Sequence, residues 1–166
     1  MKDFPTIGCC GIDCALCPRY HTKGSSKCPG CFGPGFSDKH PGCSIITCCV
    51  KRRGLETCAQ CEAFPCEKFG GFDSADSFVT HKMCLKNLGT IREMGLSEFL
   101  KSQEKRIQLL ERMLEEYDDG RSKGFYCLSA ALLPMEDLER AIGQASSDHG
   151  VTDKKKRQSC CEGPCR

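Results

Sequence analysis

The chain has 166 residues, of which 17 are cysteine, and its charges nearly balance, since 24 Lys and Arg face 22 Asp and Glu. A net charge of +2 lacks the basic excess that nucleic-acid-binding proteins usually carry. Aromatic residues, on which bases would stack, are only 7% of the chain, and tryptophan is absent. No apolar run reaches the length of about 18 residues that a membrane-spanning helix needs. Composition therefore argues against nucleic acid and against a membrane as partners.

Cysteine at this frequency is typical of a short chain held together by disulfides or by metal ions. The start, Met1 to Pro5, has no apolar run behind a positive charge, so no secretory signal is visible. The number of cysteines is odd, and a closed set of disulfides cannot use all of them. Because disulfides persist mainly in oxidising compartments, we expect reduced cysteines that bind metal in the cytoplasm, rather than a disulfide framework.

The distribution of cysteine predicts three parts of the chain. Residues 1–71 hold twelve of the cysteines and are rich in Gly and Pro, which predicts turns and loops. Such a short segment usually needs a metal or disulfides to be stable. Residues 72–147 show helical periodicity, and residues 148–166, which are basic and hold the last cysteines, are expected to form a flexible tail. The expected fold is mainly α with irregular loops, in which a metal-stabilised N-terminal domain packs on a small helical part.

Helix signals are sparse in the first half of the chain. One short helix is expected over residues 44–53, with Gly54 as its stop signal. Asp73 and Ser74 form a plausible N-cap for a further helix, because apolar residues follow at helical spacing as far as Ile91.

The clearest helix is expected from Ser97 to Tyr117, because residues recur at steps of three and four on one face. Gln103 is the only polar member of this face. The face consists of Leu96, Leu100, Gln103, Ile107, Leu110, Leu114 and Tyr117. Residues 125–133 form an apolar segment that we expect to be helical and buried, and Pro134 suits the first turn of a last helix.

Three pairs of the form Cys-x-x-Cys lie within 48 residues. The two-residue gap makes a tight turn in which both sulphur atoms can reach one ion, and tetrahedral zinc takes a second pair from elsewhere. Cys14 and Cys17 combine with Cys28 and Cys31 into such a zinc-finger-like set.

The third pair, Cys58 and Cys61, could form another zinc site with Cys66 and with Cys48 or Cys43. A 4Fe–4S cluster is the alternative to zinc, because three close thiolates and a remote one often hold such clusters. One local triple runs from Cys10 to Cys17 and another from Cys58 to Cys66. Both a zinc ion and an iron–sulphur cluster therefore remain possible as the group that these cysteines bind.

Other residues with ligand chemistry have simpler interpretations. His21 and His40 lie among the cysteines and could be ligands, but isolated loop histidines are more often solvated. Cys84 and Cys127 are expected to be small buried hydrophobic side chains, as free cysteine often is; the other possibility is a reactive thiol or a remote ligand. The tail thiols could complete a metal site, capture a soft metal or form disulfides. They are Cys160, Cys161 and Cys165.

Three cysteine motifs follow one another along the first part of the chain. Residues 10–18 read Cys-Gly-Ile-Asp-Cys-Ala-Leu-Cys-Pro, and a Cys-x-Gly-Cys motif follows. Residues 58–66 then contain a Cys-x-x-Cys pair followed by Phe-Pro-Cys. In this order the motifs resemble a family of cysteine-rich bacterial and archaeal proteins that is known only as a domain of unknown function. The resemblance covers residues 8–70, and the helical part is similar to longer members. It implies no reaction, but it implies metal ligation by Cys10, Cys14, Cys17, Cys28, Cys31, Cys43, Cys48, Cys58, Cys61 and Cys66.

Cys49 is a further candidate ligand, although like Cys9 it lies outside the family pattern. Four thiolates leave no open position on zinc, which is typical of a structural metal site. We therefore expect a binding or adaptor module with a protein partner. The alternatives are an iron–sulphur protein with a redox role and a protein that handles soft metals. No nucleophile–base pair or phosphate loop is recognised, so the sequence assigns no enzyme activity.

Overall fold

The computed structural model describes residues 4–40, 42–72 and 81–147. Helices dominate these ranges, and the strand pairing within them is limited to an isolated bridge between Ile7 and Asp13. The predicted fold class, mainly α with irregular loops, is confirmed. The elements are η1 (Cys14–Leu16), α1 (Phe36–Lys39), α2 (Ser44–Ile46), η2 (Thr47–Arg52), η3 (Cys58–Gln60), η4 (Glu67–Phe69), α3 (Cys84–Met94), α4 (Leu96–Glu116) and α5 (Lys123–Leu132).

The chain divides into two compact units, Met1–Leu132 and Leu133–Arg166. The first unit contains the cysteine-rich loops together with α3, α4 and α5, while the described part of the second contains a helix over residues 135–147. The domain boundaries expected from composition stay predictions. The expected N-cap at Asp73 and Ser74 and the tail after residue 147 lie outside the described residues. Within the described ranges, no helix combines the length and apolarity needed to cross a membrane.

The short helix expected over residues 44–53 is confirmed, because α2 continues directly into the π-helical turn η2. Cys43 precedes it, and its Sγ accepts a hydrogen bond from the backbone N–H of Ile46 at 3.5 Å. This contact occupies one of the N–H groups that a helix start leaves without an intrahelical partner. Gly54 follows at a φ of 65°, a conformation that glycine adopts without steric cost, and the helix ends there.

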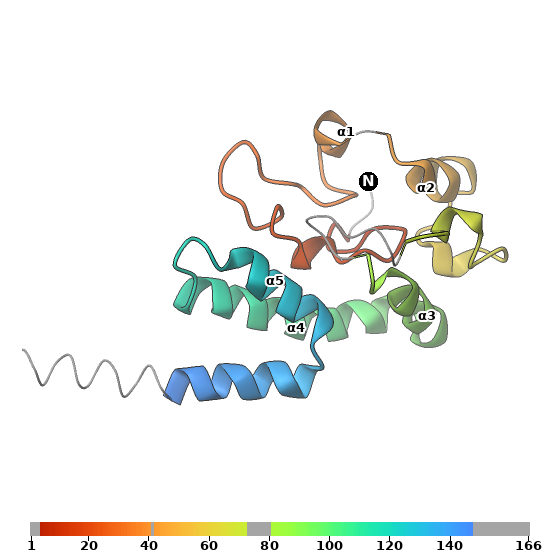
Figure 1. The fold of residues 1–166 in the computed structure, drawn as a ribbon. Helices are drawn as coiled ribbons and strands as arrows, with labels where there is room; N and C mark the ends of the chain where they lie inside the picture. The colour runs from red at the N-terminus through yellow and green to blue at the C-terminus, as the bar shows by residue number, and fades with distance from the viewer. Residues whose placement is uncertain (1–3, 41, 73–80, 148–166) are drawn as a thin grey trace, which may run out of the picture. The chain divides into compact units, whose positions relative to one another are not determined.

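The long helix expected from Ser97 to Tyr117 is confirmed as α4, and it packs against both α3 and α5. Figure 1 shows α4 and α5 side by side. The buried face differs in part from the expected one. It is centred on Phe99, Gln103, Leu110 and Met113. Because α4 has helical neighbours on two sides, its apolar stripe is wider than one line of residues, and Ile107 and Leu114 lie half-buried beside it.

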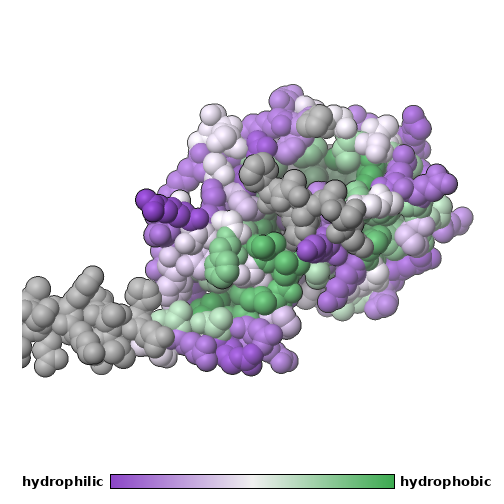
Figure 2. Space-filling view, viewed as in Figure 1, coloured by the Kyte–Doolittle hydropathy of each residue, from purple (hydrophilic) through white to green (hydrophobic). Residues whose placement is uncertain are grey.

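The helix expected within residues 125–133 is confirmed as α5, but the prediction that this segment is buried is wrong for its large side chains. Phe125, Leu128 and Leu132 are 68%, 47% and 38% exposed. Hydrophobic surface extends over α5 in Figure 2. The buried side chains of α5 are the small ones, Cys127, Ala130 and Ala131. Small residues allow close approach to α4, so the larger apolar side chains point outward.

Asp13 connects the cysteine-rich loops to the helices. The side-chain amide of Asn87 in α3 donates to its Oδ2 at 2.8 Å and to the carbonyl of Gly11 at 2.9 Å. Gln103 in α4 donates from Nε2 to Oδ1 of the same carboxylate. Burial raises the pKa of Asp13, whereas these two hydrogen bonds and the nearby Arg106 oppose that rise. Gln103, the only polar residue on the expected apolar face of α4, is therefore a hydrogen-bond partner of Asp13.

Replacement of Asp13 by alanine should remove this connection. Asn87 and Gln103 are buried, and buried amides that lose a charged partner cost about 2–4 kcal/mol in all. We expect Asp13→Ala to lower the free energy of unfolding by about that amount in urea denaturation at fixed metal content. Glu98→Ala, which removes an exposed ion pair to Lys101 on α4, should cost about 0.5 kcal/mol or less. Equal losses in the two variants would contradict this role of Asp13.

Candidate metal centres

The fourteen cysteines of the described residues are all free thiols. Nine of them are buried, and the other five, Cys31, Cys43, Cys48, Cys61 and Cys66, are of intermediate exposure. The buried thiols share the interior with few apolar side chains, among them Ile7, Ile45 and Phe69. Thiols therefore make up a large share of the core of the cysteine-rich loops.

Four thiols line a first hollow of about 220 Å³. They are Cys14, Cys17, Cys28 and Cys31. The Sγ atoms of Cys14 and Cys31 lie 3.4 Å apart, which is too far for a disulfide bond of about 2.05 Å. In a tetrahedral site with Zn–S bonds of about 2.3 Å, neighbouring sulphur atoms are about 3.8 Å apart. The observed spacing is close to that value, so both thiols could reach one ion.

Backbone geometry holds the two turns of the first hollow together. The backbone N–H of Cys31 donates to Cys14 Sγ at 3.4 Å, and the backbone N–H of Cys28 donates to the carbonyl of Arg19 at 2.9 Å. Burial raises the pKa of Cys17, while backbone N–H groups of Arg19 and Tyr20 oppose the rise. N–H donors to sulphur stabilise thiolates, and such outer contacts commonly orient metal ligands.

His40 also lines the first hollow. Its Nε2 lies 3.3 Å from Cys28 Sγ, and its ring stacks on Phe36 with a centroid distance of 4.4 Å. Burial lowers the pKa of His40, which favours the neutral ring. The sequence indicated a solvated histidine here, and the twelve-residue separation from Cys28 carried no signal for their contact. His21 instead places Nε2 at 2.6 Å from the carbonyl of Ala15.

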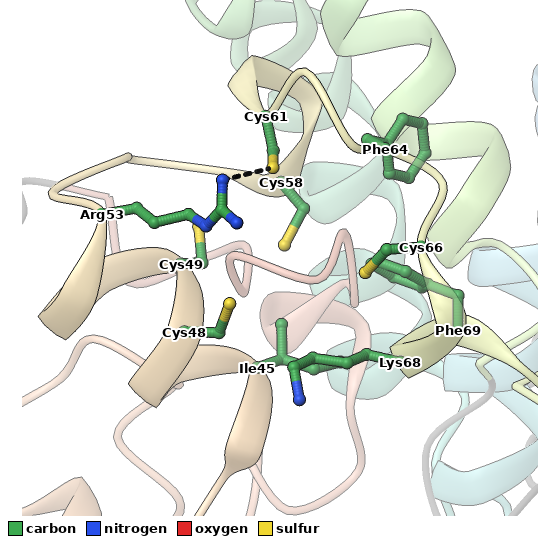
Figure 3. A pocket seen from close by; sticks show the side chains of 10 residues that line it. All are labelled: Ile45, Cys48, Cys49, Arg53, Cys58, Cys61, Phe64, Cys66, Lys68 and Phe69. Atoms are coloured by element: carbon green, nitrogen blue, oxygen red, sulfur yellow. Dashed lines mark hydrogen bonds between the residues drawn. The ribbon is translucent and has the colours of Figure 1, made fainter.

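Five thiols line a second, smaller hollow of about 30 Å³. Cys48 and Cys49 come from η2, Cys58 and Cys61 from η3, and Cys66 from the turn before η4. In Figure 3 the sulphur atoms of Cys48, Cys58 and Cys66 face the space between these turns.

Arg53 is the cationic neighbour of these thiols. Its Nη1 lies 3.6 Å from Cys61 Sγ, the contact dashed in Figure 3. Its pKa is raised, chiefly by the charge of Cys61 and next by a contact with Cys48. A guanidinium at this place favours the ionised form of the sulphur atoms. Sequence reasoning had not singled out Arg53, since its place beside Cys61 depends on how the turn after η2 folds.

The remaining described cysteines lie outside the two hollows. Cys10, a predicted ligand, contacts the fully buried thiol of Cys84 in α3, and this contact lowers the pKa of Cys10. Cys43, another predicted ligand, lines a separate surface hollow together with Cys31 and His40. Cys84 and Cys127 are buried, as expected.

The thiols around each hollow are too far apart to form a complete metal site. Within residues 4–40, 42–72 and 81–147, no three His, Cys, Asp or Glu side chains stand as a group ready to hold a metal ion. Ligation would require the sulphur atoms around each hollow to draw closer. The donor types fit zinc, because they are thiols and the imidazoles of His40 and His81. Metal ligation by the eleven predicted cysteines stays a prediction.

The turn at Gly30 offers a direct test of the first hollow. Gly24 and Gly30 share a φ of 82°, but a Cβ on Gly30 would lie 2.2 Å from the carbonyl oxygen of Pro5, whereas one on Gly24 meets nothing within 4 Å. Gly24→Ala should cost about 1–2 kcal/mol from backbone strain alone. Gly30→Ala should cost clearly more and also weaken zinc binding, measured by urea denaturation and by competition with a coloured chelator. Equal zinc affinity in both variants would contradict the importance of this turn.

Thiol reactivity should follow burial in the metal-free, reduced protein. Burial raises the pKa of Cys127 to about 12, and the thiolate is the reactive form. We expect iodoacetamide to modify Cys31, Cys48 and Cys61 within minutes and to leave Cys127 unmodified until the protein unfolds. Peptide mass spectrometry at successive times measures this order. Early modification of Cys127 in the native protein would contradict the packing of α5.

Comparison with known proteins bears on the cysteine-rich segment. Residues 6–71 match the model of a family described as a protein of unknown function, DUF3795. Neither the search of curated proteins nor that of solved structures gave a match to this chain. The match ends at residue 71, so the similarity of the helical part to longer family members stays a prediction. The match over residues 6–71 thus agrees with the resemblance found in the cysteine motifs.

Proposed function

We propose that this protein binds zinc at two cysteine centres, one at each hollow, and that the metal holds the N-terminal loops in place. The observation that carries the proposal is the separation of nine cysteines into two groups, each with at least the four thiols that tetrahedral zinc requires. The first centre would use Cys14, Cys17, Cys28 and Cys31. The second would use four of the cysteines that line the smaller hollow.

The metal role is structural in this proposal. Zinc with four thiolates has no open coordination position for a substrate. Its contribution would be folding free energy, because each ion joins turns that are distant in the sequence. Thiols remain available for zinc only under reducing conditions, so the cytoplasm is the compartment that we propose.

Beyond metal binding, we propose that the protein serves as a binding or adaptor module for a protein partner. The exposed apolar stripe of α5 supports this role, since Phe125, Leu128 and Leu132 recur at helical spacing on the surface. Exposed apolar surface of this kind often marks protein contact sites.

A 4Fe–4S cluster with a redox role is the second candidate, and one observation favours it. The first hollow, at about 220 Å³, is larger than a single ion needs, and it has four thiols on its walls. Three or four cysteine thiolates are the usual ligands of such clusters. The second hollow, at about 30 Å³, is too small for such a cluster.

Elemental analysis of anaerobically purified protein distinguishes these candidates. We expect zinc without acid-labile sulphide. Chelation should melt the tertiary structure of the cysteine-rich segment, seen as a loss of near-UV circular dichroism and of amide protection within residues 6–71, while α4 loses less of its protection. Iron with equimolar sulphide in brown protein would contradict zinc and support the cluster.

Single substitutions assign the ions to centres. Cys17→Ser should remove the zinc of the first centre only, and Cys61→Ser should affect the second only. Cys127→Ser is the matched control, because it removes a thiol that is buried outside both hollows. A similar zinc loss in the control would show that the losses reflect general damage rather than lost ligands.

A further inference from the structure

Cys9 contacts two thiols that line the second hollow, although it is not itself among the lining residues. Its side chain is 1% exposed and contacts the thiols of Cys49 and Cys58. Its backbone carbonyl accepts a hydrogen bond from the N–H of Cys58 at 2.8 Å, which fixes the two residues against each other. Because Cys49 and Cys58 line the hollow themselves, they connect Cys9 to the other thiols of the hollow.

Six thiols therefore form one continuous group. They are Cys9, Cys48, Cys49, Cys58, Cys61 and Cys66. One tetrahedral ion would use four and leave two thiols without a role in binding. Two tetrahedral ions need eight metal–sulphur bonds, and six thiolates supply eight when two of them bridge. Cys49 and Cys58 suit the bridging role, since each contacts the thiol of Cys9 and also lines the hollow together with Cys48, Cys61 and Cys66.

Charge favours the same arrangement. Six thiolates around one divalent ion would leave four negative charges in a largely buried place, at a high desolvation cost. A second divalent ion reduces this to two negative charges. Arg53 and Lys68, which line the hollow, can offset a charge of that size.

We propose that the second centre is a two-metal site that holds two zinc ions through six cysteines, with Cys49 and Cys58 as bridging ligands and Cys9 as a terminal ligand. The two-metal site presupposes the zinc binding proposed above. It differs from that proposal in the number of ions and in the participation of Cys9, which neither the family pattern nor the Cys-x-x-Cys pairs include.

Counting zinc in the intact chain tests the site. The tail cysteines are first replaced by serine, so that they add no metal: C160S, C161S and C165S. Native mass spectrometry of this zinc-saturated protein should show about three ions, one in the first centre and two in the second. Adding Cys9→Ser should lower the number to about two. Adding Cys127→Ser instead, which removes an equally buried thiol, should leave it at about three.

Cobalt gives a second readout that needs no change to Cys9. As cobalt(II) fills the tail-substituted protein, its electron paramagnetic resonance signal should first grow and then fall, because thiolate bridges couple neighbouring ions magnetically. Two zinc ions in both the parent and the Cys9→Ser protein, or a cobalt signal that grows in proportion to saturation, would overturn the two-metal site and leave the zinc function intact. Protein without zinc, or with iron and sulphide, would overturn both.

Discussion

Contact between buried thiols is the interaction on which the cysteine-rich segment depends. Sulphur meets sulphur at Cys14 and Cys31, and further thiol contacts join Cys10 to Cys84 and Cys9 to its neighbours. A contact between neutral thiols is weak, since a thiol is a poor hydrogen-bond donor and acceptor. A segment of this size has too little apolar surface to fold on burial alone. Metal–sulphur bonds are therefore the strongest interactions available to these loops, and the proposed zinc ions would supply them once the sulphur atoms around each hollow draw closer.

The helical half depends on the same segment through one carboxylate. Asp13 directly precedes Cys14, the first residue of η1, and its oxygen atoms accept from α3 and α4. Any change that moves the first cysteine turn therefore also moves the partner of two buried amides. We infer that metal binding at the first hollow stabilises the packing of α3 and α4 as well as the loops, because Cys14 and Asp13 are adjacent on one backbone.

The sequence predicted the local parts of this structure and missed those that depend on the fold. Periodicity located α4 and α5, and Gln103 stood out as polar on an apolar face before its partner Asp13 was visible. Two-residue spacing grouped Cys14, Cys17, Cys28 and Cys31 correctly in space, since such pairs form rigid turns. Contacts such as Cys10 with Cys84, or His40 with Cys28, join residues whose separation follows no motif. The sequence did not predict that the large apolar side chains of α5 are exposed, because apolar composition does not tell which side of a helix packs against a neighbour.

The two hollows differ in size and in charged neighbours, and this difference constrains the metal chemistry. The first has about 220 Å³ with Arg19, His40 and His81 on its walls, whereas the second has about 30 Å³ beside Arg53 and Lys68. A cubane cluster has four metal and four sulphide atoms inside its ring of cysteines, so only the first hollow has the space for one. Zinc ions, which bring no sulphide with them, suit both places. A protein with clusters alone would have to expand the second hollow against Ile45, Phe64 and Phe69, and close-packed aromatic side chains resist such expansion. The geometry thus supports the proposed zinc ions over a cubane cluster at the second centre, whichever group occupies the first.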